Sequence, residues 1–417
     1  METTGKSTTR RGLKPERSKM FWRALQRLDG LEPDSRGANP ARPRAGPNPY
    51  KKPQFFDTLA KRRWAGLGDA VRLETYGIAT APPNIRALFD RQMRVEGSWD
   101  WFAILAATTL SGREEACVVV LVDAQGDTLA AMPLVLIGGQ AVRGLTSPFT
   151  THFCPPLGDE DNARHFGKLL AARVGAALRL DALDTTERAI AALEEGLAAG
   201  GLCVLRFRHF ANWFEPIQDF AEYWNSRGSK LKATVKRKAA PLLRENRLGF
   251  DQIDVTACWR EAGGIYNAIY AKSWKPAEPH PLFIDALLQK LGPAGTARLA
   301  IARIDGVPVA AQIWLVQNGR ATIFKLAHDP AFDGQSPGTL LTHWMLERLH
   351  EQDSVRDVDF GRGDDAYKRL WLSSVRDRIG LLAANPKSFK GIATIIFDIL
   401  PARFAAMMRA GRPSHEI

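Results

Sequence analysis

Several features that would mark a secreted, membrane-spanning or metal-dependent protein are missing from this chain of 417 residues. Its four cysteines (Cys117, Cys154, Cys203 and Cys258) are scattered, with no C-x-x-C pair and no adjoining histidine at the spacing that zinc sites use, which argues against a zinc site and a disulfide framework. No stretch approaches the roughly 18 apolar residues of a membrane span, and the amino-terminal region has no apolar run typical of a signal peptide. We therefore expect a cytoplasmic protein that needs no metal.

The common catalytic motifs are also missing. The sequence contains no G-x-x-x-x-G-K-[ST], no H-E-x-x-H and no G-x-S-x-G, which argues against a P-loop NTPase, a zincin protease and an α/β-hydrolase. Gly361-Arg362-Gly363 lacks the third glycine and the ribose-binding acid of a dinucleotide site. His343 and His350 fit one face of a helix better than a metal site.

Acidic residues are scarce near the amino terminus. Residues 1–63 contain 16 Lys or Arg and 6 Asp or Glu, a net charge of +10, so that only +2 of the chain's total of +12 remains for the other residues. The same region is rich in proline, and we expect a disordered basic tail over residues 1–65, with one short amphipathic helix at Met20–Leu28. Because the rest of the chain is nearly neutral, the high pI mostly describes the tail, and we do not expect a nucleic-acid partner.

Beyond the tail the hydrophobic pattern indicates an α/β protein with an internal duplication. The hairpin predicted at Val118–Ile137 has a counterpart at Leu299–Val316; both have an Asp- and Gly-containing turn and a second strand with paired alanines, Ala130-Ala131 and Ala310-Ala311. We expect helices over 162–178 and 185–199. The predicted domains are 66–224 and 225–385, each a mixed twisted sheet flanked by helices.

Two further segments carry helical patterns. Residues 225–248 form a basic segment that we expect to be a helix broken by Pro241. It is either a solvated bridge between the halves or an electrostatic guide for an anionic ligand. Residues 386–417 begin with an amphipathic helix, which either packs on the body or makes peripheral contact with a membrane. The short helix of the tail either docks on a partner or a membrane surface or folds onto its own domain.

The stretch Arg320–Leu349 combines strand, loop and helix. Arg320–Leu326 alternates β-branched and aromatic residues, and helical spacing follows from Leu340 onwards. The loop between them contains Gly334, Pro337 and Gly338, so its backbone can approach a ligand closely. The start of the helix is a predicted anion site, because its free N–H groups and the positive end of its dipole point to the same place.

The order strand, Gln335-Ser336-Pro337-Gly338-Thr339, helix resembles the acyl-CoA pyrophosphate loop of the Gcn5-related N-acetyltransferase (GNAT) superfamily. That pattern has Gln or Arg, two residues, Gly, one residue, then Gly or Ala, where this chain has Leu340. Motifs around Trp274 and around Asp359-Phe360-Gly361 and Tyr367-Lys368 resemble the BioF2-like, CelD-type branch, which is associated with cellulose or exopolysaccharide production.

The resemblance implies an acyl-CoA-dependent N-acyltransferase, with acetyl-CoA as co-substrate and a small-molecule or sugar amine as acceptor. It implies that the donor is held by the residues Leu326, Ala327, His328, Gln335, Ser336, Pro337, Gly338 and Thr339. Tyr367 is the expected general acid, and Asp359, Asp364, Asp365 and His328 are candidates for a base. Acceptor-pocket candidates are Trp274, Lys275, Lys325 and Lys368.

Two other functions stay open on the sequence. A FemAB-like transferase would share the twin-domain plan but take an aminoacyl group from charged tRNA, using the basic residues Lys236, Arg237 and Lys238. A non-catalytic GNAT-fold scaffold in polysaccharide assembly would fit the departure at Leu340. The oligomeric state, the acceptor and the acyl length are not encoded in any pattern that we recognise.

Overall fold

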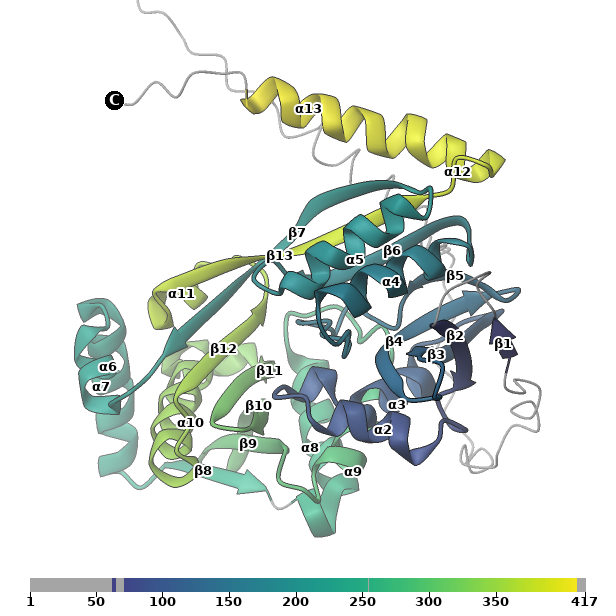
Figure 1. Ribbon diagram of the computed structural model, residues 1–417. Helices are drawn as coiled ribbons and strands as arrows, with labels where there is room; N and C mark the ends of the chain where they lie inside the picture. Colours follow the sequence, from purple (N-terminus) through teal and green to yellow (C-terminus); the bar gives the residue numbers. More distant parts are fainter. Residues whose placement is uncertain (1–61, 65–70, 254, 411–417) are drawn as a thin grey trace, which may run out of the picture. The chain divides into compact units, whose positions relative to one another are not determined.

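The computed structural model describes residues 62–64, 71–253 and 255–410 (Figure 1). The tail predicted over 1–65, with its helix at Met20–Leu28, therefore lies outside the described residues except for 62–64. No helix among the described residues is both long enough and apolar enough to cross a membrane.

The described strands form one mixed sheet. Their order across the sheet is β1-β2-β3-β4-β5-β6-β13-β7-β12-β11-β10-β9-β8. In chain order the strands are β1 (Arg62–Trp64), β2 (Arg72–Gly77), β3 (Glu114–Val122), β4 (Thr128–Ile137), β5 (Gln140–Gly144), β6 (Val174–Asp184), β7 (Cys203–Pro216), β8 (Leu248–Ile253), β9 (Ala297–Ile304), β10 (Val307–Gln317), β11 (Arg320–His328), β12 (Asp357–Arg362) and β13 (Ser374–Ala384).

Two similar halves meet in the middle of this sheet. Strands β2 to β5 are antiparallel neighbours and β5 is parallel to β6; strands β8 to β11 repeat this arrangement, and β11 is parallel to β12. The final strands are exchanged, because β7 of the first half pairs with β12 while β13 of the second half pairs with β6, and β7 and β13 pair with each other. The predicted duplication is confirmed, and each half completes the sheet of the other.

Helices cover the sheet on both faces. In the C-terminal half, Leu299 and Ile301 face a core that contains residues of α8 and α9, whereas the alternate residues Ala300 and Ala302 face a core built with α7 and α10. The helices are α2 (Pro83–Asp90), α3 (Trp99–Thr108), α4 (Glu160–Ala171), α5 (Arg188–Ala199), α6 (Phe220–Ser226), α7 (Ser229–Arg244), α8 (Val255–Lys272), α9 (Phe283–Leu291), α10 (Pro337–Asp353), α11 (Lys368–Trp371), α12 (Phe389–Thr394) and α13 (Leu400–Ala410), with short 3-10 turns η1 (Val95–Gly97) and η2 (Pro330–Gln335) and the π-helical turn η3 (Ile395–Ile399).

The two predicted hairpins are β3–β4 and β9–β10. All four alanines are fully buried in β4 and β10, where their small side chains let other elements approach the sheet. Another prediction was wrong: the helix expected over 162–178 ends at Ala171, and Val174–Asp184 is the central strand β6. Its pairing with β13, about two hundred residues away in sequence, outweighs the helix propensity of its Ala and Leu residues.

The basic segment is also more regular than expected. Helix α7 continues through Pro241 and ends at Arg244, so the missing N–H falls in the last two turns, where it interrupts little of the helix. Leu231 and Leu242 are buried against the body. The basic side chains of α7 therefore lie toward solvent, on a helix that packs against α10.

Candidate functional site

The parallel strands β11 and β12 separate after a short paired stretch. Their pairing ends at Thr322 and Asp359; from there β11 continues beside β10, while β12 pairs with β7. The backbone of the second part of β11 therefore borders the opening between the two strands. The predicted pantetheine-binding residues Leu326, Ala327 and His328 lie on this part of β11.

Helix α10 begins beside this opening with an unusual backbone turn. Ser336 has a φ of 55°, in the left-handed region, and its carbonyl accepts the N–H groups of Thr339 and Leu340 at 3.0 and 3.1 Å. Pro337 has no N–H, and the first turn contains no acidic residue. In the described part of the chain the N–H of Gly338 has no partner, so it can meet an anion at the positive end of the helix dipole.

Gly338 leaves room for such an anion. A Cβ atom at this position would come no closer than 3.5 Å to its nearest neighbour, His328 Nδ1. Leu340, which departs from the family pattern, is 2% exposed and packs into the core between α10 and the sheet. Its side chain therefore does not stand where a phosphate would lie, and the departure does not block the loop. The remaining loop residue, Gln335, is half-buried at the end of η2.

Tyr367 lies just before α11, and its hydroxyl is 2.7 Å from the Thr342 hydroxyl on α10. Thr342 Oγ1 donates to the Gly338 carbonyl at 2.9 Å and accepts from Gln312 Nε2 at 2.7 Å. A hydroxyl has one donor and two acceptor positions, so Tyr367 is the donor in its bond with Thr342. Burial raises the pKa of Tyr367 to about 12. The phenol is thus protonated. Its hydroxyl is held against Thr342, which lies one helical turn after Gly338 on α10.

Three of the predicted acceptor-pocket residues surround the end of β11. Lys275 Nζ donates to the Leu326 carbonyl at 2.6 Å, and both Lys325 and Glu278 lie close by, with Lys325 Nζ 2.8 Å from each Glu278 oxygen. Burial, followed by repulsion from Lys325, lowers the pKa of Lys275 to about 8. Trp274 packs against His328, with ring centroids 4.6 Å apart and ring planes tilted by 51°. The sequence did not reveal Glu278.

Lys368 is buried but is directed elsewhere. Its Nζ donates to the Arg362 carbonyl at 2.5 Å and to the Gly363 carbonyl at 3.3 Å, and it lies 3.7 Å from Asp365. These bonds hold the turn that follows β12. Asp364 accepts hydrogen bonds from Trp213 and Arg369. Lys368 therefore positions the segment before Tyr367.

Asp359, the predicted partner of Tyr367, is 4% exposed at the point where the strands separate. Its carboxylate accepts from Asn212 Nδ2 at 2.6 Å, from Arg376 Nη2 at 2.7 Å and from the Gly361 N–H at 2.7 Å, with Arg94 at 3.7 Å. Burial opposes ionisation, but Arg376 and Arg94 outweigh it, and the pKa of Asp359 is lowered. This geometry suits a structural anion better than a proton acceptor.

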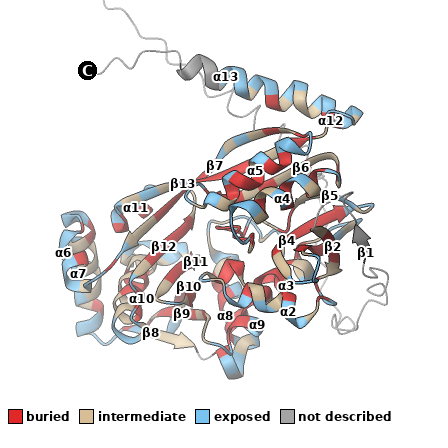
Figure 2. Ribbon diagram, in the orientation of Figure 1, coloured by how far each residue is buried: buried red, intermediate tan, exposed pale blue. Residues whose placement is uncertain are grey.

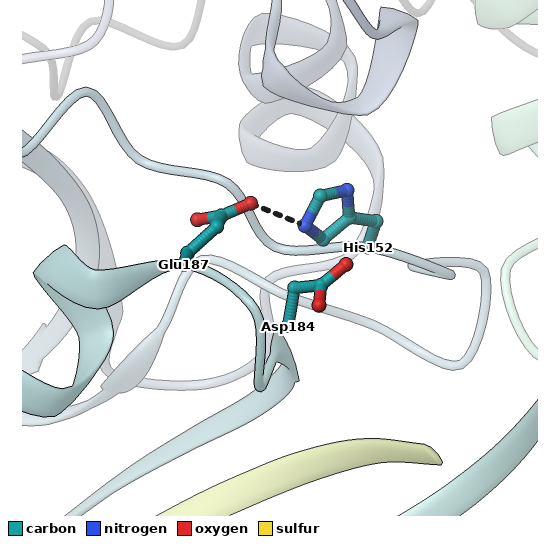
Figure 3. A group of neighbouring side chains, drawn as sticks. All are labelled: His152, Asp184 and Glu187. Carbon is teal, nitrogen blue, oxygen red and sulfur yellow. Dashed lines mark hydrogen bonds and ion pairs between the residues drawn. The ribbon is translucent and has the colours of Figure 1, made fainter. Parts of the chain in front are cut away.

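A second titratable group, which sequence reasoning missed, lies in the N-terminal half (Figure 3). His152 Nε2 is 3.0 Å from Glu187 Oε1, and Asp184 lies beside them. Burial and the nearby Asp184 raise the pKa of Glu187 to about 7, whereas burial and Arg378 hold the pKa of His152 well below its usual value. A signal was present: Glu187 precedes α5 after β6 as Tyr367 precedes α11 after β12.

Residue types alone would allow a metal ion at this group. The oxygens of Asp184, however, are already used: Arg378 Nη1 pairs with Oδ2, and Oδ1 accepts the Thr186 N–H and hydroxyl at 3.0 and 2.8 Å. A guanidinium already bonded to a would-be ligand also opposes a cation by repulsion. The donor set therefore fits a hydrogen-bonded His–Glu pair better than a metal centre.

Residues 229–369 match the family described as "Acetyltransferase (GNAT) domain". This span runs from α7 to α11 and includes the separated strands, the α10 start and Tyr367. The match thus falls within the C-terminal half of the chain. No curated protein matches the sequence.

Several solved structures resemble this chain at low sequence identity. FemX matches with a TM-score of 0.53 and 11% identity, covering 76% of this chain and 99% of that one. A tandem GNAT protein from the clavulanic acid biosynthesis pathway matches with a TM-score of 0.46 and 13% identity, covering 76% and 100%. The C-terminal domain of a putative lysylphosphatidylglycerol synthetase from Agrobacterium fabrum matches at 0.47 and 13%, covering 75% and 93%.

Proposed function

We propose that the protein is an acyl-CoA-dependent N-acyltransferase that moves an acetyl group to an amine by direct attack in a ternary complex. The observation that carries the proposal is the start of α10, where an unpartnered Gly338 N–H, no acidic side chain and the open edge of β11 come together. The pyrophosphate would lie on Gln335–Thr339 and the pantetheine arm along Leu326–His328.

The reaction requires a bound acyl donor, a neutral amine close to the thioester carbonyl, and a proton donor for the leaving thiolate. The amine nitrogen attacks the thioester carbonyl carbon, the C–N bond forms, the C–S bond breaks, and the thiolate takes a proton while the amine loses one. Holding donor and acceptor together supplies about 7–11 kcal/mol of the barrier, so no covalent enzyme intermediate is required. We assign Tyr367 as the proton donor for the thiolate, because its hydroxyl is protonated and it follows β12 and the loop helix, where the resemblance to the GNAT superfamily implies a tyrosine near the thiolate.

Lys275 is a stronger candidate for the proton acceptor than Asp359. Among the groups at the open edge it combines a lowered pKa of about 8 with a hydrogen bond to the β11 backbone, at 2.6 Å from the Leu326 carbonyl. A lysine with this pKa is substantially neutral near pH 8 and can accept the proton of the attacking amine. Lys325 is paired with Glu278 and stays a cation that lines the pocket.

The acceptor class rests on the resemblance to the BioF2-like, CelD-type branch, which favours a sugar amine in cellulose or exopolysaccharide production. Calorimetric titration of the full chain with acetyl-CoA tests the donor. We expect saturable binding, and the folded protein giving no heat at millimolar acetyl-CoA would contradict the proposal. Release of free thiol across a panel of amino sugars, amino acids and polyamines then tests the acceptor.

A FemAB-like transferase that takes its donor from aminoacyl-tRNA is the second candidate, favoured by the fold shared with FemX. It requires tRNA to bind the solvent side of α7, where Lys236 and Arg237 are exposed and Lys238 is half-buried. A salt-sensitive tRNA complex that is lost when these three residues are changed to glutamine would favour it. The non-catalytic scaffold loses its main support because Leu340 belongs to the core.

A further inference from the structure

The C-terminal helical segment exposes a continuous apolar face. Among the described residues, 14 large apolar side chains are exposed, and six of them lie in this one segment. Phe389 is 94% exposed, Phe397 75% and Phe404 61%. The others are Ile392, Ile396 and Leu400, between 42 and 51% exposed. Figure 2 shows the exposed positions recurring along α12 and α13.

These side chains share one face of a helix. Phe389, Ile396, Leu400 and Phe404 follow one another at intervals of seven, four and four residues, which is the spacing of one helical stripe. The segment continues from α12 through η3 into α13. An apolar patch of this extent on a protein surface marks an interaction site rather than random exposure.

The opposite face of the segment is fixed to the sheet. A Cβ atom at Gly391 would lie only 2.1 Å from the Asn385 carbonyl and 2.7 Å from the Ala176 carbonyl of β6, so the backbone touches the sheet end here. Ile399 is fully buried, and Arg403 Nη2 donates to the Val204 carbonyl of β7 at 2.6 Å. The apolar stripe therefore cannot turn inward to bury itself.

Charge distinguishes between the surfaces that could cover the stripe. Exposed Lys387 and Lys390 flank Phe389, and residues 386–417 contain five Lys or Arg (387, 390, 403, 409 and 412) against two acids (398 and 416). Residues 386–417 therefore carry a net charge of +3, so two copies placed face to face would bring like charges together, whereas an anionic surface would attract each copy.

We propose that this face, Phe389–Phe404, binds the surface of an anionic lipid bilayer, with the helix lying in the plane of the interface. The phenylalanines enter the boundary between headgroups and acyl chains, and Lys387 and Lys390 meet the anionic headgroups. The proposal is independent of the acyltransferase function, since none of these residues belongs to the acyl-CoA site.

Co-sedimentation of the full chain with extruded vesicles tests it, with phosphatidylcholine alone compared with a three-to-one mixture of phosphatidylcholine and phosphatidylglycerol. We expect binding to the anionic vesicles and at least about tenfold weaker binding to the neutral ones. The combined variant Phe389→Ser, Phe397→Ser, Phe404→Ser should lose at least about a hundredfold in affinity, as expected for three apolar insertions removed. It retains the basic amino-terminal tail, so the test isolates the helix.

The matched control is Leu243→Ser, Leu282→Ser, Val307→Ser, which removes three other exposed apolar side chains and should bind as the parent does. Equal thermal midpoints of the two variants exclude unfolding as the cause. The proposal is overturned if the parent stays in the supernatant with anionic vesicles, or if the phenylalanine variant binds as tightly as the parent. It is also overturned if sedimentation equilibrium without lipid shows a dimer that the phenylalanine variant abolishes, because the face would then belong to a second copy.

Discussion

Helices α4 and α10 occupy equivalent places in the two halves, each joining the two parallel strands of its half. Only the first turn of α4 contains acidic residues. At α4, the Asp159 side chain accepts the Asn162 N–H at 2.8 Å, and Glu160 and Asp161 occupy the first turn. At α10 there is no side-chain cap and no acid. The N-terminal half has thus filled its anion site with its own carboxylates, whereas the C-terminal half has left the equivalent site open.

The segments before these helices differ as well. In the C-terminal half, η2 leads directly to α10. In the N-terminal half the connection is longer and reaches the other half: the ring of Phe149 lies 4.2 Å from that of Phe283, and Lys325 Nζ lies 4.3 Å from the Phe149 ring. The proposed donor site therefore lies in one copy of the duplicated unit, and the other copy contributes a wall beside the lysines at the end of β11.

The largest effect should follow from closing the open helix start. We expect Gly338→Val to abolish acetyl-CoA binding, with no saturation at millimolar ligand in calorimetry, because a branched side chain would stand where the loop backbone meets the pyrophosphate. The protein should stay folded, since a Cβ there has only an ordinary contact at 3.5 Å.

Asp161→Val at the equivalent position of α4 is the matched control. Asp161 is exposed and pairs with Arg164 at 2.7 Å, so its loss should leave both the fold and the acetyl-CoA affinity unchanged. Unchanged affinity in Gly338→Val, or an equal loss in the two variants, would place the donor elsewhere and remove the distinction between the halves.

The contrast between the halves could be predicted from sequence only in part. The loop at Gln335–Thr339 and the paired alanines are local patterns, and local patterns carried the prediction of β4, β11 and α10. The exchange of β7 and β13 and the burial of Asp359 between Arg94 and Arg376 depend on residues far apart in sequence. A single sequence contains no periodic signal for such pairings, so the predicted helix over 162–178 was extended into the first residues of β6.

The departure at Leu340 illustrates the same limit. Its position in the motif was visible, but the direction of its side chain was set by the packing of α10 on the sheet. Thr342 is the converse case: it lies four residues after Gly338, one turn further along the same helix face, so its contact with the loop could have been predicted from spacing.

The second-largest effect concerns the residues that precede α5 and α11. Tyr367→Phe should lower the turnover number by about 10²- to 10⁴-fold and leave acetyl-CoA affinity nearly unchanged, because it removes the proton but keeps the ring. Glu187→Gln, the counterpart in the N-terminal half, should change turnover by no more than a few fold. Steady-state kinetics measures the turnover number, and calorimetry measures the acetyl-CoA affinity separately.

Thr342→Val tests the role of Tyr367 in a second way. It removes the hydroxyl that accepts the hydrogen bond from Tyr367 while leaving the phenol in place. A turnover loss smaller than that of Tyr367→Phe is expected. If Thr342→Val and Tyr367→Phe were equally slow and both lost donor affinity, Tyr367 would support the loop and the acid would be another group.

A smaller effect should follow from giving α10 the charge of α4. Thr339→Glu places an acid in the first turn, as α4 has Glu160 and Asp161, and should weaken acetyl-CoA binding about tenfold through repulsion of the phosphates at the helix start. Thr339→Gln, of equal size and no charge, should bind nearly as the parent does. Raising the salt concentration should reduce the difference between the two variants. Equal affinities at low salt would mean that the phosphates do not lie at this helix start.

The smallest effect concerns two cations that follow equivalent helices, Arg94 after α2, which follows β2, and Lys275 after α8, which follows β8. Burial opposes the charge of Arg94, yet Asp359 outweighs it and the pKa of Arg94 is raised, whereas the pKa of Lys275 is lowered to about 8. An arginine stays charged at any physiological pH, while a lysine with this pKa gains its neutral, proton-accepting form as pH rises.

With an arylamine acceptor, which is already neutral at pH 7, kcat/KM should rise about fivefold between pH 7 and pH 8 in the parent, following the neutral fraction of Lys275. Lys275→Arg keeps the cation beside the Leu326 carbonyl but cannot release its proton, so its rate should be lower and independent of pH over this interval. A Lys275→Arg profile that rises as the parent's does would assign the proton acceptor to another group and leave Lys275, like Arg94, as a fixed cation.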